Sequence, residues 1–479
     1  VVWRHLFYRI GIFRWVLIES EREYYRVPGM AVAVIAGDEV VFSQGLGVRD
    51  QENNAPFTPQ TRFLIGSTTK SMTSLLVAQL VDAGLIAWDT PVADIIPGFR
   101  TADPERTAQI TIRDLMSMGT GLTSNTTDGF YWGDWTFNDL VAAVGEQAVA
   151  GEYRQYYAYN NEVYALAGYA AALASGGAAT RQSYAELLQE RVFEPIGMPS
   201  AVITDDPRDL GDNFALPYEI PLIGDIDTPA QMGIPPLGIV APSGGVWTTL
   251  EDMARYLMTQ MNGGVTPEGE RIVSEAALAE TWAAGVPMGE VDQALEDAHY
   301  GMGWVSLRYQ GVPIRYHDGG WSGYATQMVV FPDADVGLII FSNSSTGALI
   351  NYALTFAFAE MLYDLEPEAS STLREQFDTF IGQLEAGRAS LPAVAIDRAT
   401  VAPLLGEYED GWQTELREDN TFWLSRGGWE FQLIPITESM YLIINNGAMG
   451  VPLSFDRQDD GVTLTIQIPG GELRIDKQR

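Results

Sequence analysis

The chain has 479 residues, of which 46% are hydrophobic, and its formal net charge at pH 7 is -35. The length predicts two or more domains, and the negative charge argues against nucleic acid or an anionic membrane as a partner, because both would be repelled. The chain has no cysteine and three histidines, which excludes a disulfide framework, a thiol nucleophile and a Cys- or His-rich metal site. We therefore expect no metal and no other cofactor.

Residues 1–19 are apolar, but they do not form a membrane span. Arg4, Arg9 and Arg14 interrupt the apolar run, which leaves no stretch long enough to cross a bilayer. No small-residue cleavage site of a signal peptide follows it, so the compartment stays open. We expect this segment to be a helix that covers the core.

The next segments predict strands at both ends of a domain with helices between them. "MAVAVIAGDEVVFSQGLG" has two β-rich runs around Gly37 and Asp38, a hairpin pattern. Residues 67 to about 300 have mainly helical patterns, and three strands then follow in "VPIRYHD", "YATQMVVF" and "VGLIIFSN" before an apolar helix over 347–362. This order predicts an α+β fold, with one antiparallel sheet built from both ends of the domain, flanked by terminal helices and accompanied by a helical subdomain.

The remaining chain predicts two further parts. The main domain would span residues 1–365, and a polar helix with a linker would occupy 366–398. Residues 399–479 have short alternating segments with frequent Gly and Asp, which is typical of a small all-β barrel.

Lysine occurs only at Lys70 and Lys477, and arginine makes up the rest of the 28 basic residues. Lys70 lies in "STTKSMTSLLVAQLVDAG", where apolar residues have helical spacing and Gly84 ends the pattern. Ser67 would stand at the start of this helix, with Lys70 one turn later on the same side. A serine hydroxyl needs a base, and a desolvated lysine can be neutral enough to accept its proton, whereas arginine stays protonated. We therefore predict Ser67 as nucleophile and Lys70 as its base.

Several blocks of the chain together resemble the serine β-lactamase and DD-peptidase superfamily, in its class C-like branch, which includes esterases and D-aminopeptidases. The resemblance covers about residues 25–363 and is far more specific than S-x-x-K alone. The blocks are "VPGMAVAVIAGDEVVFSQGLG", "FLIGSTTK", "LVDAGLIAWDTPVADIIPGF", "ITIRDLMSMGTGL", "FEPIGMPS" and "PSGGVWTTLEDMARYL".

The resemblance implies a second motif, Y-x-N, which matches Tyr159-Asn160-Asn161. Tyr159 would be a second proton carrier with Lys70, and Asn161 would orient the substrate and the lysine. In an extended segment, positions 159 and 161 point the same way.

The third motif of this family matches His317-Asp318-Gly319 at the end of a predicted strand. His317 could donate a hydrogen bond and adjust the local charge, and Gly319 would let the strand backbone approach the substrate. The oxyanion hole implied by the resemblance consists of the backbone N–H groups of Ser67 and Gly320.

Aromatic residues lie in loops that we expect to rim the pocket and to favour apolar groups; they are Phe130, Tyr131, Trp132, Trp135 and Trp247. The C-terminal β-module resembles lipocalin-like domains attached to some relatives, with a role in shielding the site, in assembly or in stability.

These observations predict a metal-independent serine hydrolase that acts through an acyl-enzyme on a small-molecule ester, amide or peptide. Two alternatives stay open. One is a penicillin-recognising DD-peptidase or β-lactamase with the same machinery. The other is a non-catalytic scaffold relative whose barrel and helices drive assembly, and a homo-oligomer is compatible with all three.

Overall fold

In a computed structural model of the protein, the described residues are 17–124, 135–221, 225–234, 236–289, 295–390, 396–426, 429–437, 439–444, 451–458, 461–468 and 471–478. The expected N-terminal helix over residues 1–19 therefore lies almost wholly outside them. Among the described residues, no helix is both long enough and apolar enough to cross a bilayer.

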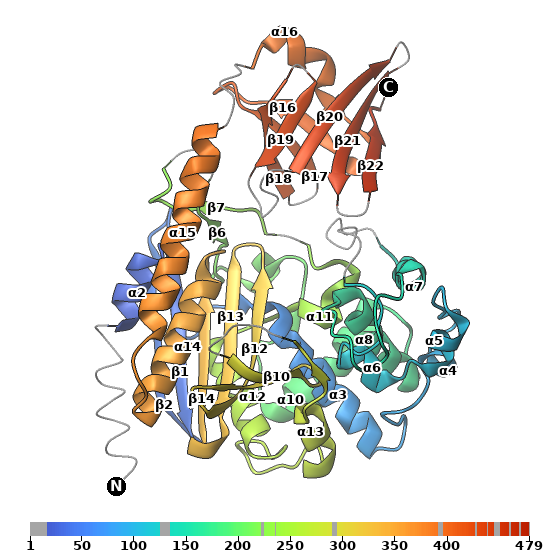
Figure 1. Ribbon diagram of the computed structural model, residues 1–479, viewed down its shortest axis with the longest axis vertical. Helices are drawn as coiled ribbons and strands as arrows, with labels where there is room; N and C mark the ends of the chain where they lie inside the picture. Colours follow the sequence, from blue (N-terminus) through green and yellow to red (C-terminus); the bar gives the residue numbers. More distant parts are fainter. Residues whose placement is uncertain are drawn as a thin grey trace.

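A large antiparallel sheet forms the centre of the main body (Figure 1). Among the described residues it has nine strands, in the order β3-β2-β1-β14-β13-β12-β11-β10-β9. The strands are β1 (Gly29–Ala36), β2 (Glu39–Asp50), β3 (Ala55–Pro56), β9 (Val286–Pro287), β10 (Leu295–Tyr300), β11 (Val305–Tyr309), β12 (Val312–Trp321), β13 (Tyr324–Phe331) and β14 (Val336–Ser342).

The two ends of the main body meet in the middle of this sheet, as the sequence predicted. β1 pairs antiparallel with β14, with Met30 opposite Ser342. Every residue of both strands is buried, because helices cover both faces of the sheet here. The predicted hairpin joins β1 to β2, and Gly37 supplies the positive φ of 56° that its tight turn requires.

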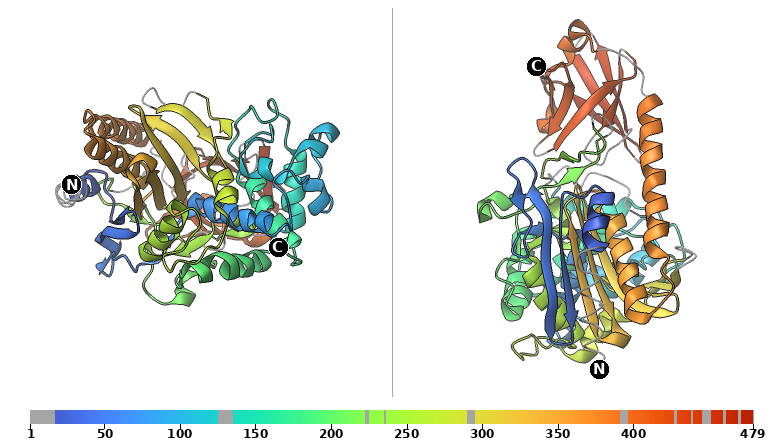
Figure 2. Two further views of the ribbon diagram at one scale, coloured as in Figure 1. Left: turned by 90° about the horizontal axis from the view of Figure 1, so that it is seen from below. Right: turned by 90° about the vertical axis from the view of Figure 1, so that its left-hand side faces the viewer.

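One face of the sheet is covered by helices from the two ends of the main body: α2 (Ile18–Tyr24), α14 (Gly347–Tyr363) and α15 (Ala369–Ser390) (Figures 1 and 2). α14 packs directly on the sheet, where Phe358 contacts the ring of Phe331. α15 is also part of the packed body, because Arg374 forms an ion pair with the buried Glu21 of α2. The polar helix predicted within residues 366–398 is therefore present and spans Ala369–Ser390.

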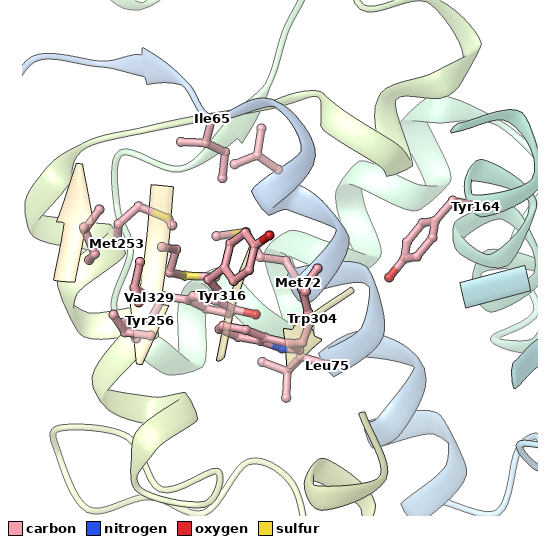
Figure 3. Close-up of a cluster of buried hydrophobic side chains, with 14 of the residues drawn as sticks. Ile65, Met72, Leu75, Tyr164, Met253, Tyr256, Trp304, Tyr316 and Val329 are labelled. Atoms are coloured by element: carbon pink, nitrogen blue, oxygen red, sulfur yellow. The ribbon is translucent and has the colours of Figure 1, made fainter. Parts of the chain in front are cut away.

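The other face carries the helical subdomain, with α3 (Thr69–Asp82) at its centre. Every residue of α3 from Thr69 to Leu80 is buried, and Met72 and Leu75 belong to the same hydrophobic cluster as Trp304 (Figure 3). The other helices are α4 (Val92–Ile95), α5 (Pro104–Gln109), α6 (Ile112–Met116), α7 (Phe137–Glu146), α8 (Asn161–Ala174), α9 (Arg181–Leu188), α10 (Glu194–Ile196), α11 (Ala241–Gly244), α12 (Leu250–Met261) and α13 (Glu275–Trp282). Short strands join this part: β4 (Phe63–Leu64), β8 (Val246–Thr248) and β5 (Val202–Ile203) form one sheet, and β6 (Tyr218–Glu219) pairs with β7 (Ala230–Gln231).

The C-terminal part is a second, curled antiparallel sheet with its own hydrophobic cluster (Figure 1). After α16 (Arg398–Val401), its described strands pair in chain order: β15 (Gly406–Glu407), β16 (Gln413–Leu416), β17 (Phe422–Arg426), β18 (Trp429–Pro435), β19 (Met440–Ile444), β20 (Val451–Gln458), β21 (Gly461–Ile468) and β22 (Gly471–Asp476). A β-bridge between Tyr408 and Lys477 connects the two ends of the curl. Ile434 and Leu442 of this sheet pack against the core of the main body.

Candidate functional site

Ser67 lies in a short 3-10 turn (Gly66–Thr68) that leads directly into α3. Gly66 has a φ of +53°, and a side chain there would stand 2.8 Å from the backbone nitrogen of Gly320. A glycine is therefore required both by the backbone conformation and by the close approach of β12. Ser67 is partly exposed while both of its neighbours are buried, so the turn presents this one hydroxyl to a ligand.

Lys70 is fully buried one turn beyond the serine. Its Nζ lies 3.1 Å from Ser67 Oγ, 2.6 Å from Asn161 Oδ1 and 2.8 Å from the carbonyl oxygen of Ser243. Burial lowers the pKa of this amine well below its ordinary 10.5, and the charge of Asp318 opposes that shift. Burial is the larger effect, so the neutral amine is favoured.

The partners of Lys70 decide where its lone pair points when it is neutral. The amide oxygen of Asn161 and the carbonyl of Ser243 can only accept hydrogen bonds, so they take the two N–H groups. The lone pair is then left facing Ser67, the one partner with a proton to give. This arrangement can abstract the proton of the serine hydroxyl.

Tyr159 approaches the same serine from the other side, and its hydroxyl donates a hydrogen bond of 2.7 Å to Ser67 Oγ. Burial raises the pKa of Tyr159 well above 10.0, so it stays a phenol that can donate a proton. Lys70 Nζ lies 4.8 Å from the centre of the Tyr159 ring and 5.4 Å from that of Tyr164. The hydroxyl of Tyr164 also donates to the backbone carbonyl of Lys70, which fixes the first turns of α3 against α8.

Asn161 reaches Lys70 from a helix start rather than from the extended segment expected around it. Asn160 is the N-cap of α8, and its side chain accepts a hydrogen bond from Val163 N, so Asn161 is the first helical residue. Its backbone carbonyl also accepts a hydrogen bond from the hydroxyl of Ser243. Tyr159 and Asn161 therefore converge on one place from either side of a helix cap.

His317 is buried beside this group, with 2% of its surface exposed. Its Nδ1 lies 2.5 Å from the carbonyl oxygen of Asp318, and its Nε2 lies 2.8 Å from the hydroxyl of Tyr300. Because a carbonyl only accepts, Nδ1 carries the proton and Nε2 accepts from the tyrosine. Burial lowers the pKa of His317 to about 4, so the ring is neutral. The hydrogen bond that His317 was expected to donate goes to the carbonyl of Asp318 in its own strand.

Gly319 and Gly320 lie where β12 passes the serine turn. A side chain on Gly319 would stand 2.1 Å from the carbonyl oxygen of Ile65 and 3.2 Å from Ser67 N, so only glycine permits this approach. Among the described residues, β11 pairs with β12 no further than Tyr316. The last part of β12 is therefore an open edge next to Ser67, and Gly320 is exposed on it.

Sequence reasoning missed three residues that hold the site together: Ser243, Tyr164 and Tyr300. Ser243 belongs to the quoted block "PSGGVW", but no spacing rule marks its carbonyl as a partner of the lysine. The two tyrosines stand in buried positions that the sequence does not distinguish from ordinary core residues.

The structure describes two of the five aromatic residues expected at the rim of the pocket, and the prediction for Trp247 is wrong. Trp247 is fully buried and packs edge-on against Tyr324, because it belongs to β8 under the serine turn. Trp135 is half-buried and lines a pocket with Arg181 whose lining includes none of the site residues. The other predicted rim residues, Phe130, Tyr131 and Trp132, lie outside the described residues.

Comparisons with known proteins identify the family of this chain. Residues 17–356 match the family model described as Beta-lactamase. A relative named "Penicillin-binding protein 4" from Amycolatopsis lactamdurans is 29% identical, over 82% of this chain and 95% of its own. A relative named "Unguisins hydrolase ungD'" from Aspergillus campestris is 26% identical, over 81% of this chain and 71% of its own.

Solved structures resemble the whole chain in fold. An octameric penicillin-binding protein homologue from Pyrococcus abyssi has a TM-score of 0.62 at 21% identity, and the match covers 98% of this chain and 100% of that one. A structure described as SurE with D-Leu has a TM-score of 0.57 at 19% identity, with 96% and 98% covered. At these identities the likeness shows the fold alone, and it includes the curled C-terminal sheet.

Proposed function

The chain belongs to the β-lactamase family, and we propose that it is a serine hydrolase that acts on carboxylic esters, amides or peptides through a covalent acyl-enzyme. Ser67 is the nucleophile in this proposal, and Lys70 and Tyr159 move its proton. One observation supports it most: a partly exposed serine hydroxyl is contacted by both a fully buried lysine and a phenol.

In the first half of the proposed reaction, Ser67 Oγ attacks the substrate carbonyl while its proton passes to the lone pair of Lys70. The backbone N–H groups of Ser67 and Gly320 hold the negative oxygen of the tetrahedral intermediate. Tyr159 gives a proton to the leaving alcohol or amine, and the proton held by Lys70 restores the phenol. Water then attacks the acyl-enzyme by the same route in reverse and releases the acid.

Two further residues support this machinery, and Asn161 also orients the substrate in the proposal. Asn161 positions Lys70 by accepting one of its hydrogens. His317 is a neutral, buried neighbour whose ring centroid lies 6.4 Å from that of Tyr159. We therefore assign it to positioning of Tyr159 and Tyr300 rather than to proton transfer.

A penicillin-recognising DD-peptidase or β-lactamase is the second candidate, and similarity to a relative named as a penicillin-binding protein favours it. The finer assignment to the class C-like branch and the lipocalin-like nature of the C-terminal sheet are part of the proposal. So are the domain limits at residues 365 and 398. Assembly into a homo-oligomer is proposed from the octameric structural relative, and a scaffold without turnover remains the alternative of another class.

Incubation with a fluorophosphonate probe followed by intact-mass analysis tests the proposal. We expect one probe molecule per chain, attached at Ser67, and labelling that a neutral ester substrate slows. Absence of labelling would favour the scaffold alternative. Stoichiometric acylation by benzylpenicillin that blocks the probe would favour the penicillin-recognising candidate.

A further inference from the structure

Asp318 lies on the open edge of β12, on the opposite face from the serine turn. Side chains alternate along a strand, and Gly319 faces Ile65 and Ser67. Asp318 therefore shares the other face with Tyr316, which contacts Tyr352 of α14. The carboxyl group stands one residue from Gly319, at the margin of the candidate site.

No described residue donates a hydrogen bond to the carboxylate of Asp318. Asp318 is half-buried, and no described residue forms an ion pair with its carboxylate. Gln327 stands directly opposite it on β13, is 1% exposed, and has an Oε1 atom without a hydrogen-bond partner among the described residues. Opposed residues on antiparallel strands have neighbouring side chains. Two acceptors are thus left beside one another, although buried acceptors are normally satisfied.

Aromatic rings lie near this carboxylate on both faces of β12. Tyr316 and Tyr352 meet edge to face with their centroids 6.1 Å apart. Tyr157 lies against Tyr300, with centroids 5.6 Å apart, and is half-buried two residues before Tyr159. Burial, and after it the charge of Asp318, raises the pKa of Tyr157, Tyr316 and Tyr352. The three phenols therefore stay uncharged, and the charge of this carboxylate acts on each of them.

A carboxylate with a neighbouring amide oxygen and several aromatic rings suits an organic cation. An ammonium group would donate to both oxygens and would be attracted to the faces of the rings. The net charge of the chain, -35, adds a field that attracts cations. An anion would be repelled by the carboxylate, by the ring faces and by the net charge.

We infer that Asp318, Gln327 and the tyrosines around them form a subsite for a protonated amine carried by the substrate. This inference rests on the proposed function and names the preferred members of its substrate class: esters, amides or peptides that bear a cationic group near the scissile bond. The ammonium group would lie behind the edge of β12 while the carbonyl lies in front of it, at Ser67.

The test measures binding without turnover, so that it is independent of hydrolysis. Phenethylammonium, 2-phenylethanol and phenylacetate are titrated by calorimetry into the Ser67→Ala variant at fixed pH and ionic strength. We expect the ammonium compound to bind at least about tenfold more tightly than the alcohol, which is about 1.4 kcal/mol, and phenylacetate to bind least. The same ammonium compound should inhibit ester hydrolysis by the unaltered protein competitively, by raising KM.

Variants of the Ser67→Ala protein test whether the preference for the cation depends on Asp318 and on the aromatic rings. Adding Asp318→Asn should reduce the preference for the cation to less than about threefold. Asp333→Asn, which removes an exposed charge in the turn after β13, should leave the preference intact and is the matched control for the general field. Tyr352→Phe should keep the preference, whereas Tyr352→Leu should weaken it several-fold. If Asp318→Asn does not fold, Asp318→Ser replaces it.

Equal binding of the cation and the alcohol would overturn the inference, and so would a preference that survives the loss of Asp318. Loss of the preference when potassium chloride replaces sodium chloride at equal ionic strength would mean that an inorganic cation occupies the site, which also overturns it. Failure of the proposed function is distinguishable, because it would appear as a lack of probe labelling at Ser67 with the cation preference unchanged.

Discussion

The Nζ of Lys70 lies 3.1 Å from the Oγ of Ser67, and the lysine is fully buried while the serine is partly exposed. This pairing places a base that prefers to be neutral behind a hydroxyl that a ligand can reach. It also accounts for the retention of lysine at position 70 in a chain where arginine provides nearly all basic residues. A guanidinium could not give up its proton in this position.

Ser67→Ala should abolish hydrolysis and probe labelling and leave the fold intact, because the side chain is small and partly exposed. Ser71→Ala is the matched control, one turn further along in α3. It removes hydrogen bonds to Thr68 and Tyr256 and should lower the free energy of unfolding by about 1–3 kcal/mol, with labelling retained. Turnover by the Ser67 variant at the rate of the unaltered protein would remove the proposed mechanism.

Lys70→Arg should be nearly as damaging to activity, although it preserves the formal charge. The guanidinium stays protonated, so no lone pair is left to accept the serine proton. Lys477→Arg is the matched control, because it replaces the other lysine of the chain. The measurement is kcat/KM for one ester. A value within about tenfold of the unaltered protein, or about 1.4 kcal/mol in the barrier, would make Lys70 an electrostatic or structural group.

His317 should make the protein less stable as the pH falls from 6.5 towards about 4. Its pKa is lowered from 6.5 to about 4 by burial, so in this window the unfolded chain binds a proton that the folded protein does not. The free energy of unfolding then falls with pH by at most about 1.4 kcal/mol per pH unit from this residue.

Chemical denaturation of the unaltered protein and of His317→Phe between pH 4 and pH 7.5 measures this loss. The difference in the free energy of unfolding between the two proteins should shrink as the pH falls, because the variant lacks the titrating group. A difference that stays constant over this range would show that His317 keeps an ordinary pKa in the folded protein.

The sequence could predict most of the sheet and the helix carrying the serine, since local patterns determine them. Alternating and continuous apolar runs mark β12, β13 and β14, and Gly37-Asp38 marks the hairpin. The joining of strands from both ends of the main body in one sheet also followed from this pattern.

The parts of the site that the sequence did not predict depend on contacts between segments far apart in the chain. The carbonyl of Ser243 reaches Lys70 across 173 residues, and no local signal marks such an acceptor. The prediction that Trp247 lies on the rim is wrong because an aromatic residue in a Gly-rich stretch is compatible both with a loop and with a short buried strand. Burial of β8 under the serine turn decides between them.

Truncation after residue 395 should leave a folded protein that the probe still labels. The residues proposed for catalysis all lie upstream, and α15 is already packed against α2. Removal of the curled sheet uncovers the surface against which Ile434 and Leu442 pack, so some loss of stability or change of assembly should accompany it. Thermal unfolding, light scattering and probe labelling check these expectations. Loss of labelling in a truncated protein that remains soluble and folded would show that the C-terminal sheet completes the site.

Substrate preference should follow the charge near the third motif. Neutral short-chain esters, and amides with an uncharged or cationic amine side, should be hydrolysed well. Benzylpenicillin and peptides ending in a free D-Ala carboxylate should be poor substrates. Asp318 faces away from Ser67 behind the edge of β12, but no described residue neutralises it, and the chain carries a net charge of -35. An anionic group bound near this edge would therefore be repelled.

A panel of p-nitrophenyl esters, D-aminoacyl amides, a D-Ala-D-Ala peptide and a β-lactam, compared by kcat/KM at fixed ionic strength, distinguishes the candidates. Raising the ionic strength should reduce the penalty on the anionic substrates, because screening weakens repulsion between exposed charges. Asp318→Asn should reduce the same penalty at low salt, whereas Asp333→Asn should change it little. If the β-lactam or the D-Ala-D-Ala peptide is preferred by about tenfold or more, which is about 1.4 kcal/mol in transition-state binding, the repulsion argument fails. The site would then hold an anion despite Asp318, as a penicillin-recognising enzyme requires.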